Sequence, residues 1–487
     1  MPPTLKQEIA RGVGWSTLGQ LVQQTLSLTS LFVLGHLLTP EDYGIVGMVT
    51  IFSGFAVVLV DVGFNRALIQ QTRLLPEQTS TVFWLGLGVG GVVFLLMYGG
   101  GGVLAWFYGV PELKAVCHLV AVTFLLIPLG GVHRALLTKR MAFKSLAFIN
   151  VTALGTGVAV AIVMALRGGG YWSLVVNVLV QQAVIVLLAW WREPWRPRFV
   201  FRPAVLGEII RFGMYLSGSV VMGYWSRYVD QLLIGALAGK QALGLYSRSS
   251  LLMLLPIQQV AARVDAVLFP AFSRIQDDKT RIAAIYLKMT RLVALVTFPM
   301  MFGLVAVAAD FVPVALGEQW RGMIPLVRLL APLGAVQSIL TMGSSLYLSF
   351  GRTDIAFRVS VIVTCANSLV FFAGLKINGV YGLAAGYLML NLLMAPWIYH
   401  KAASLAGLGL RDMFWNLWHI AVGSWAMAAG VYLLGMALPG LPPLLRLALS
   451  VFAGALSYLA MLRILRAPAY HEVLALVRQR LGRFRAP

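Results

Sequence analysis

Residues 34–48 read LGHLLTPEDYGIVGM, and residues 234–248 read IGALAGKQALGLYSR. Aligned without a gap at an offset of 200 positions, the two stretches share identical residues at three places: Gly35 with Gly235, Leu37 with Leu237, and Gly44 with Gly244. Each stretch is a short turn between two long apolar segments, so each predicts a hairpin of two helices. Two copies of one hairpin, if they are more than a chance likeness between short apolar turns, predict a chain built from two related halves.

The composition assigns the chain to a class of protein. Of its 487 residues, 59% are hydrophobic and only 11% are charged, against about 25% charged residues in an average soluble domain. Such a chain cannot cover itself with a polar surface, so we expect an all-α integral membrane protein. The net charge of +21 does not indicate nucleic acid, because the basic residues lie in short loops between apolar segments, where anionic lipid headgroups are their expected partners.

Apolar runs long enough to cross a bilayer follow one another along the whole chain. A spanning helix needs about 20 mostly apolar residues. Fourteen such runs are predicted, at 12–38, 44–66, 81–107, 113–137, 147–166, 171–191, 210–237, 242–269, 285–309, 325–350, 356–375, 378–399, 413–437 and 443–462. An even number of spans places both termini on the same side of the membrane.

The distribution of Lys and Arg chooses that side. With the N-terminus in the cytoplasm, only seven of the 38 Lys and Arg residues fall in outer loops, namely Lys114, Arg167, Lys240, Arg321, Arg328, Lys376 and Arg446. Most of the others lie in inner loops and the C-terminal tail. This bias predicts cytoplasmic termini, since loops rich in Lys and Arg stay inside.

The repeated hairpin and the span count together predict the domain organisation. Because six predicted spans separate the two hairpins, both copies enter the membrane in the same sense, as expected for parallel repeats related by an axis along the membrane normal. We therefore expect an N-lobe at 1–200 (helices 1–6), a C-lobe at 201–400 (helices 7–12), and two additional helices with a basic cytoplasmic tail at 401–487.

Charged residues inside the predicted helices are the first candidates for a functional site. Each Arg or Asp in mid-helix costs about 2.5–3.5 kcal/mol on an insertion scale, so such residues usually face a bundle interior or an aqueous cavity. Asp230 and Arg248 each lie nine positions from Gly239 at the centre of the second hairpin, and Arg227 lies one helical turn from Asp230. Arg263 is a further basic residue within a predicted helix. These residues predict either a salt-bridge cluster that locks two helices or a cationic cavity for an anionic substrate.

The first predicted helix is unusually polar. It reads GWSTLGQLVQQTLSLTSLFVL, and Gln20, Gln24, Ser27 and Ser30 recur at intervals of three or four residues. This spacing predicts a polar stripe, which either joins helices or lines a cavity able to bind sugar hydroxyls. Asp61, near the end of the second helix, is a candidate coupling residue, although Arg66 lies five positions away and would neutralise it.

Neither a metal nor a cofactor is expected. The two cysteines, Cys117 and Cys365, each lie within an apolar segment, which excludes a disulfide framework and a cysteine-rich metal site. The six histidines form no ligand cluster along the sequence.

Five blocks of sequence carry a family resemblance: LTPEDYGIVGMVTIFSGFAVVLVDVGFNRALIQ (38–70), HRALLTKRMAFKSLAF (133–148), WRPRFVFRP (195–203), YVDQLLIGALAGKQALGLYSRSSLLMLLP (228–256) and VLFPAFSRIQDD (267–278). They resemble the polysaccharide-transport branch of the multidrug/oligosaccharidyl-lipid/polysaccharide (MOP) flippase superfamily, in particular exporters of the colanic-acid and exopolysaccharide type. The blocks lie within residues 38–278, and the helix count fits over the rest.

The resemblance implies a transporter rather than an enzyme. It implies a flippase that moves undecaprenyl-pyrophosphate-linked oligosaccharide repeat units across the bacterial inner membrane by alternating access around a cationic cavity. Carried onto this chain, it places Asp230 and Arg248 near that cavity. The implied partners are the lipid-linked oligosaccharide and membrane lipids, with a polymerase and other polysaccharide assembly proteins as further candidates.

Two other functions remain open at this point. A drug or metabolite antiporter of the same superfamily more often has acidic coupling residues in its first lobe, where this chain offers only Asp61 within the membrane. A membrane polysaccharide polymerase or glycosyltransferase typically needs a sizeable outer loop or an acidic catalytic constellation, and the short outer loops supply neither.

Overall fold

The protein is helical throughout the part of the chain that the structure describes. The computed structural model describes residues 5–60, 68–69, 76–201, 206–468 and 470, and these include no strand. The chain forms two compact units, Met1–Gly244 and Leu245–Pro487. The expected all-α membrane fold is confirmed.

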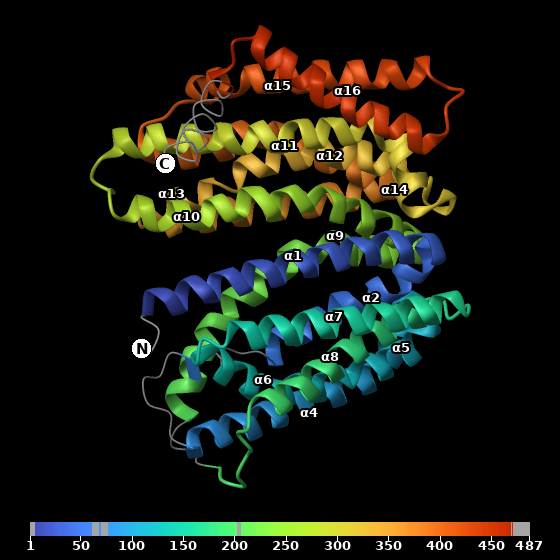
Figure 1. Cartoon of the computed structure of the whole chain (residues 1–487), viewed down its shortest axis with the longest axis vertical. Coiled ribbons are helices and arrows are strands. Elements are labelled where there is room, and N and C mark those ends of the chain that lie inside the picture. Colours follow the sequence, from blue (N-terminus) through green and yellow to red (C-terminus); the bar gives the residue numbers. More distant parts are fainter. Residues whose placement is uncertain (1–4, 61–67, 70–75, 202–205, 469, 471–487) are drawn as a thin grey trace, which may run out of the picture. The chain divides into compact units, whose positions relative to one another are not determined.

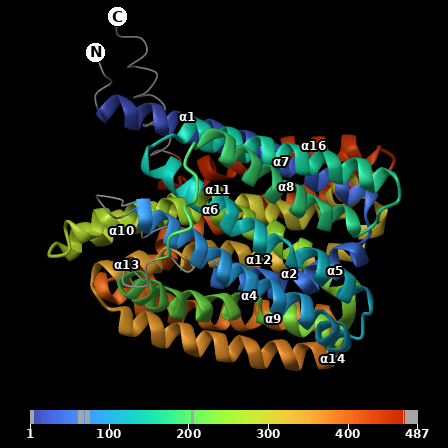
Figure 2. The same ribbon diagram turned by 90° about the horizontal axis from the view of Figure 1, so that it is seen from below.

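The first unit consists of long helices that lie side by side (Figure 1). Their bounds are α1 (Leu5–Leu37), α2 (Pro40–Val60), α4 (Pro76–Tyr108), α5 (Glu112–Ala121), α6 (Thr123–Lys139), α7 (Phe143–Leu166), α8 (Trp172–Arg192) and the first part of α9 (Leu206–Pro256). Within this unit α7 packs against both α1 and α8, and α4 packs against α5 and α6. Figure 2 shows α1, α7 and α8 next to one another in a second view.

The second unit begins within α9 and continues as a second set of long helices. Its remaining elements are the π-helical turn η2 (Ile257–Ala261), α10 (Ala262–Ser273), α11 (Lys279–Leu316), the 3-10 turn η3 (Glu318–Trp320), α12 (Met323–Leu340), α13 (Gly343–Ser349), α14 (Thr353–Ala403), the 3-10 turn η4 (Ser404–Ala406), α15 (Leu410–Ala437) and α16 (Pro443–Ile464). Helix α11 packs against α12, α15 and α16, so it is central to this unit.

Eleven helical segments among the described residues are long and apolar enough to span a membrane. Two of them, Gly223–Ser273 and Thr353–Ala406, each contain a turn whose backbone angles are not helical, at Gly239 and at Asn378–Gly379. In each case, one of the two spans expected from the sequence lies before the turn, and the other lies after it. Helix α1 coincides with the expected first span but is not among the eleven. The total of fourteen spans therefore remains a prediction.

Three expected spans are interrupted helices, and one of them, at 325–350, is formed by α12 and α13, which are separated at Thr341 and Met342. The span expected at 113–137 is formed by α5 and α6, which meet at Val122. The span expected at 242–269 includes Pro256, and η2 follows that proline directly. Proline removes a backbone donor from the helix, and a single π-helical turn is a common local adjustment of the hydrogen-bond ladder.

Glycines allow helices of the first unit to approach one another closely. A Cβ at Gly90 of α4 would lie within van der Waals overlap of the Phe124 carbonyl of α6. A Cβ at Gly157 of α7 would overlap the side chains of Asn177 and Gln181 on α8. Small residues at such contacts are typical of membrane helices, because lipid offers no hydrophobic driving force and close packing supplies the attraction instead.

The two repeated hairpin stretches meet in a reciprocal backbone contact. A Cβ at Gly44 would overlap the carbonyl oxygen of Lys240, and a Cβ at Gly244 would overlap the carbonyl oxygen of Pro40. Adding 200 to position 44 gives Gly244, and subtracting 200 from position 240 gives Pro40. The offset of the sequence repeat therefore converts one contact into the other. One of the three identical pairs of the sequence repeat, Gly44 with Gly244, therefore lies where the two stretches touch.

Polar contacts between helices also hold the second unit together. The hydroxyl groups of Thr297 on α11 and Ser338 on α12 lie 2.9 Å apart, and both residues are fully buried. On α16, the Nε of Arg446 donates to Oδ2 of Asp310 on α11 at 2.9 Å, and a second nitrogen pairs with the other carboxylate oxygen. A bidentate arginine–carboxylate pair of this kind fixes the orientation of both side chains.

Candidate substrate-translocation site

The part of α9 that carries the predicted charges is fixed against α2. The Tyr224 hydroxyl donates to the carbonyl oxygen of Ile51 at 2.7 Å. The ring of Trp225 lies 5.2 Å from that of Phe55, measured between centroids. A Cβ at Gly54 would overlap the Tyr224 hydroxyl, so the glycine makes room for this contact. These contacts determine which way the following turn of α9 faces.

Arg227 and Asp230 lie on that following turn. They are three residues apart in a helix and therefore share one face. Arg227 is exposed, and it forms no ion pair with the residues that the structure describes. Asp230 is half-buried, and its Oδ1 accepts a hydrogen bond from the backbone nitrogen of Gln231 at 2.7 Å. Within the first unit the predicted pair on one face is present.

The other two predicted arginines belong to the second unit. Arg248 is half-buried on α9, and Gly239 does form the turn that the sequence predicted between Asp230 and Arg248, with φ of 82°. Because Asp230 and Arg248 belong to different units, their meeting remains a prediction. Arg263 is exposed on α10, where its Nη2 donates to Oε1 of Gln259 at 2.6 Å. Fifteen residues of helix rise by about 22 Å, so Arg263 lies at a different depth from Arg248.

The two glutamines of the polar stripe lie away from the helix that α1 contacts. Gly12 and Gly19 of α1 face α7, where a Cβ on either would overlap the side chain of Phe143 or Ala147. Gln20 is exposed and Gln24 is half-buried. At 100° per residue, both are turned about 100–140° from Gly19.

Large apolar side chains occupy a third face of α1. Leu18 and Leu21 are 52% and 62% exposed, and at the same angular step they lie about 60–160° around the helix from the glutamines. One face of α1 is therefore apolar, one contacts α7, and one carries the amides. This arrangement fits a helix with lipid on one side and a polar space on another.

Asp61 falls outside the described residues, so its proposed role as a coupling residue stays a prediction.

The described part of the chain contains no group of three or more His, Cys, Asp or Glu residues that could hold a metal ion. Both cysteines are free, Cys117 buried and Cys365 exposed.

The sequence reading missed the ionic partners of Lys240. The sequence predicts only that Lys240 is a basic residue of an outer loop. In the structure its Nζ lies 3.4 Å from Oε1 of Glu112 and 3.6 Å from Oε2 of Glu41. The lysine next to the reciprocal glycine contact therefore ties α9 to α2 and to α5. The sequence repeat could have indicated these ion pairs, because it includes Lys240 and the glycine whose backbone Lys240 approaches.

A second missed feature fixes the segment that follows α8. Glu193 is fully buried, and its Oε2 lies 3.1 Å from Nη1 of Arg140. The Trp195 carbonyl oxygen lies 3.2 Å from Nε2 of His133, a residue that is also fully buried. The Nη1 of Arg196 donates to the carbonyl oxygens of Glu193 and Trp195. The beginning of this segment is therefore attached to α6 and to the residue that follows it.

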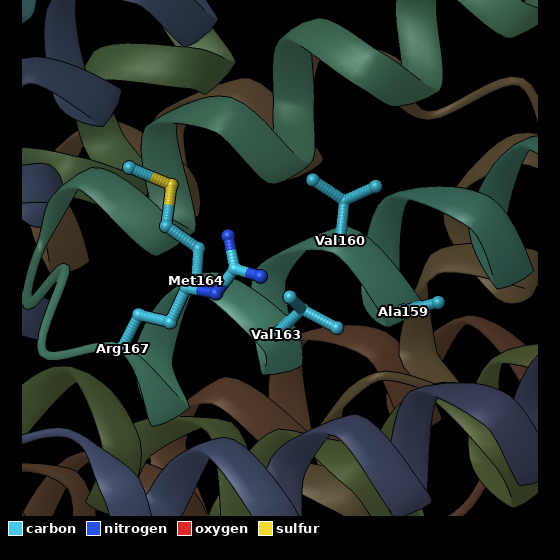
Figure 3. Close-up of a pocket in the computed structure, with 5 residues that line it drawn as sticks. All are labelled: Ala159, Val160, Val163, Met164 and Arg167. Atoms are coloured by element: carbon cyan, nitrogen blue, oxygen red, sulfur yellow. The ribbon is translucent and has the colours of Figure 1, made fainter.

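A surface depression on α7 does not have the chemistry of a sugar-phosphate site. It has a volume of about 370 Å³ and is lined by Ala159, Val160, Val163, Met164 and Arg167 (Figure 3). Four of these residues belong to α7 and Arg167 follows its last residue, and only Arg167 is polar. A binding site for a bulky anionic sugar needs polar groups converging from several elements.

Comparisons with known proteins agree with this architecture. The family described as "Polysaccharide biosynthesis protein" matches residues 33–325. The teichuronic acid biosynthesis protein TuaB of Bacillus subtilis (strain 168) is 29% identical over 473 residues, covering 94% of this chain and 96% of that protein. The succinoglycan biosynthesis transport protein ExoT of Rhizobium meliloti (strain 1021) is 30% identical over 335 residues, covering 68% of this chain and 67% of that protein.

The fold is similar to a solved transporter. The lipid II flippase MurJ in an inward closed conformation superposes with a TM-score of 0.75 at 13% identity, covering 94% of this chain and 99% of that one. At this identity the likeness concerns the fold. Together with the helices long enough to span a membrane, the family match shows that this chain is a multi-pass membrane protein of the polysaccharide biosynthesis family.

Proposed function

We propose that this protein flips undecaprenyl-pyrophosphate-linked oligosaccharide repeat units from the inner to the outer leaflet of a bacterial inner membrane, for the synthesis of a surface polysaccharide. Both termini lie in the cytoplasm in this proposal. The substrate enters from the cytoplasmic side, binds between two lobes, and leaves on the outer side as the lobes rock around it.

The observation that carries the proposal is the exposed Arg227 within a membrane-spanning segment. It forms no ion pair with the described residues. A charge in such a segment is costly unless it faces water or an oppositely charged group. Pyrophosphate offers several acceptor oxygens, and arginine pairs with phosphate through two parallel hydrogen bonds. Arg248 adds a second positive charge, and the amides of Gln20 and Gln24 are suited to sugar hydroxyls.

The relatives favour transport over catalysis. ExoT is named as a biosynthesis transport protein, and MurJ is named as a flippase. The connections that we expect on the outer side are short, such as 167–171 between α7 and α8 and 438–442 between α15 and α16. They leave no room for a catalytic domain of a polymerase or glycosyltransferase.

The reciprocal hairpin contact supports two lobes related by a twofold axis. In a pair of equivalent elements around such an axis, residue i of one touches residue j of the other and the reverse is also true. The contacts of Gly44 with Lys240 and of Gly244 with Pro40 follow this rule at an offset of 200. We therefore propose lobes at 1–200 and 201–400, with 401–487 as an addition. A polymerase and other polysaccharide assembly proteins are the proposed partners beyond the substrate and the membrane lipids.

The test is the analysis of lipid-linked intermediates in a strain from which the gene has been deleted. We expect one undecaprenyl-pyrophosphate-linked repeat unit to accumulate, facing the cytoplasm and protected from a membrane-impermeant label. Expression of the wild-type gene should restore polymer export and remove the accumulated intermediate. A deletion strain that makes normal polymer and accumulates no intermediate would contradict the proposal.

A further inference from the structure

A row of basic and aromatic side chains crosses three helices of the first unit. The Nζ of Lys144 on α7 lies 5.0 Å from the centre of the Trp15 ring on α1. The guanidinium of Arg192, the last residue of α8, lies 4.8 Å from the centre of the Phe148 ring on α7 and 4.4 Å from that of Trp191. Phe148 follows Lys144 by one helical turn, so the two share a face of α7. The five side chains therefore form one surface, which we call the aromatic–basic row.

The aromatic–basic row is exposed, although three of its five side chains are large rings. Trp15 and Phe148 are each 42% exposed, Trp191 is 68% exposed, and the two cations are exposed as well. Helix α7 packs against both α1 and α8 (Figure 2), so the three helices present these side chains without any contribution from the second unit. Large apolar side chains that gather on a surface mark a contact with a partner or with the membrane.

The row lies at one edge of the apolar part of α7 and α8. Residues 145–166 follow Lys144, residues 172–191 precede Arg192, and neither stretch contains a charge. At 1.5 Å per residue the stretches are about 33 Å and about 30 Å long, close to the thickness of a hydrocarbon core. Because α7 begins and α8 ends at this edge, both cations lie at the level of the lipid headgroups, on the side that we expect to be cytoplasmic.

No carboxylate of the described residues neutralises either cation of the row. None of the ion pairs in that part of the chain involves Lys144 or Arg192. Glu193 follows Arg192 directly, but it is buried and pairs with Arg140. An aromatic ring attracts a cation through its quadrupole and leaves the positive charge in place. The row therefore carries two positive charges that favour an anion, at a depth where anionic headgroups lie.

Apolar side chains continue this surface towards the middle of the membrane. Leu18 lies one helical turn beyond Trp15 on α1 and is 52% exposed. Leu187 lies one turn before Trp191 on α8 and is 68% exposed. Tryptophan is enriched at the boundary between headgroups and acyl chains, because its ring is apolar and its N–H is polar. A molecule with a charged head and an apolar tail matches this order, whereas a free anion or an acidic protein segment matches only the cations.

We propose that the aromatic–basic row binds the headgroup of an anionic phospholipid in the leaflet that we expect to be cytoplasmic. Lys144 and Arg192 pair with its phosphate, and its acyl chains lie against Leu18 and Leu187. The bound lipid is a partner of the first unit and is not transported. None of the residues proposed for the substrate belongs to the row, and the test measures binding to the purified protein, so this proposal and the proposed function fail separately.

The test is native mass spectrometry of the purified full chain in detergent, with phosphatidylglycerol or phosphatidylcholine added at equal concentration. We expect the wild type to bind one phosphatidylglycerol with a dissociation constant on the order of tenfold lower than that for phosphatidylcholine, whose headgroup has no net charge. Inorganic phosphate at the same concentration should not displace the phosphatidylglycerol, because it has no acyl chains to lie against the apolar side chains.

Variants of the two cations measure what each contributes. Lys144→Gln and Arg192→Gln should each raise the dissociation constant for phosphatidylglycerol about fivefold, as expected for one basic residue at a membrane surface. Arg198→Gln is the matched control, because Arg198 is an exposed arginine a few residues beyond the row, and it should bind the lipid like the wild type. Phe148→Leu keeps an apolar side chain and removes the ring beside Arg192, so it should weaken binding without any change of charge.

Three results would each overturn the proposal. Equal binding of the two phospholipids by the wild type would show that the row does not select an anionic headgroup. An equal loss of affinity in Arg192→Gln and Arg198→Gln would show that the net charge of the surface attracts the lipid and that no site exists. Displacement of phosphatidylglycerol by inorganic phosphate at equal concentration would show that the row recognises the free anion.

Discussion

Gly44 lies directly against the backbone carbonyl of Lys240, so closely that a side chain at position 44 would overlap that oxygen. The equivalent contact joins Gly244 to Pro40. Both glycines are helical, so their small size and not their backbone freedom is what the structure uses.

Gly44→Ala should destabilise the contact. Inserting a methyl group where there is no space typically costs about 1–3 kcal/mol, and the neighbouring atom here is backbone oxygen that cannot rotate away. We expect a lower melting temperature of the purified protein and reduced polymer export. Gly91→Ala is the control, because nothing lies within 4 Å of a Cβ at that helical position. Equal melting temperatures of Gly44→Ala and Gly91→Ala would mean that the close contact between α2 and α9 contributes nothing to the stability of the protein.

Lys240→Gln should have a small effect that depends on salt. Its two partners, Glu41 and Glu112, are half-exposed or exposed, and an exposed ion pair contributes about 0–1 kcal/mol. We expect a modest loss of stability at low ionic strength that disappears in high salt, where charges are screened. Thermal unfolding over a range of salt concentrations measures this. A large loss that is independent of salt would show that Lys240 acts through packing.

Arg227→Ala should leave the protein folded and inserted but abolish polymer export. Its guanidinium is exposed and contributes no ion pair within the described part of the chain, so little stability is lost with it. Arg248→Ala should have the same effect on export. Complementation of the deletion strain, together with the amount of protein in the membrane, measures both properties.

Arg167→Ala provides the matched control for these two variants. Arg167 is an exposed arginine at the end of α7, in the apolar depression that was excluded as a substrate site. We expect it to complement fully. If Arg227→Ala and Arg248→Ala also complemented fully, the cationic cavity would be assigned to the wrong residues.

Glu193→Gln should loosen the segment that follows α8. The buried carboxylate holds Arg140, whose side chain is 59% exposed and can return to water when the pair is broken. The loss should therefore be about 1–3 kcal/mol, below the 3–5 kcal/mol typical when a fully buried charge is left behind. Limited proteolysis should cut residues 194–201 faster in this variant. Glu318→Gln, a change at an exposed carboxylate, should leave the cleavage rate unchanged.

The helices could be predicted because their signal is local. A run of about 20 apolar residues is recognisable without knowing what it contacts, and the expected spans coincide with the observed helices from α4 to α16. Even the turn at Gly239 was placed correctly, since glycine alone readily adopts the positive φ found there. The interruptions at Val122 and at η2 were not predicted, because an apolar sequence remains apolar across a bend.

The sequence by itself determined that this is a helical membrane protein with a repeated hairpin, and which few charged residues lie within its helices. Only the tertiary structure decided what those residues contact. It attached Lys240 to Glu41 and Glu112, and it buried Glu193 beside Arg140. The physical reason is that hydropathy depends on neighbours along the chain, whereas an ion pair or a ligand site depends on groups that folding brings together from distant helices.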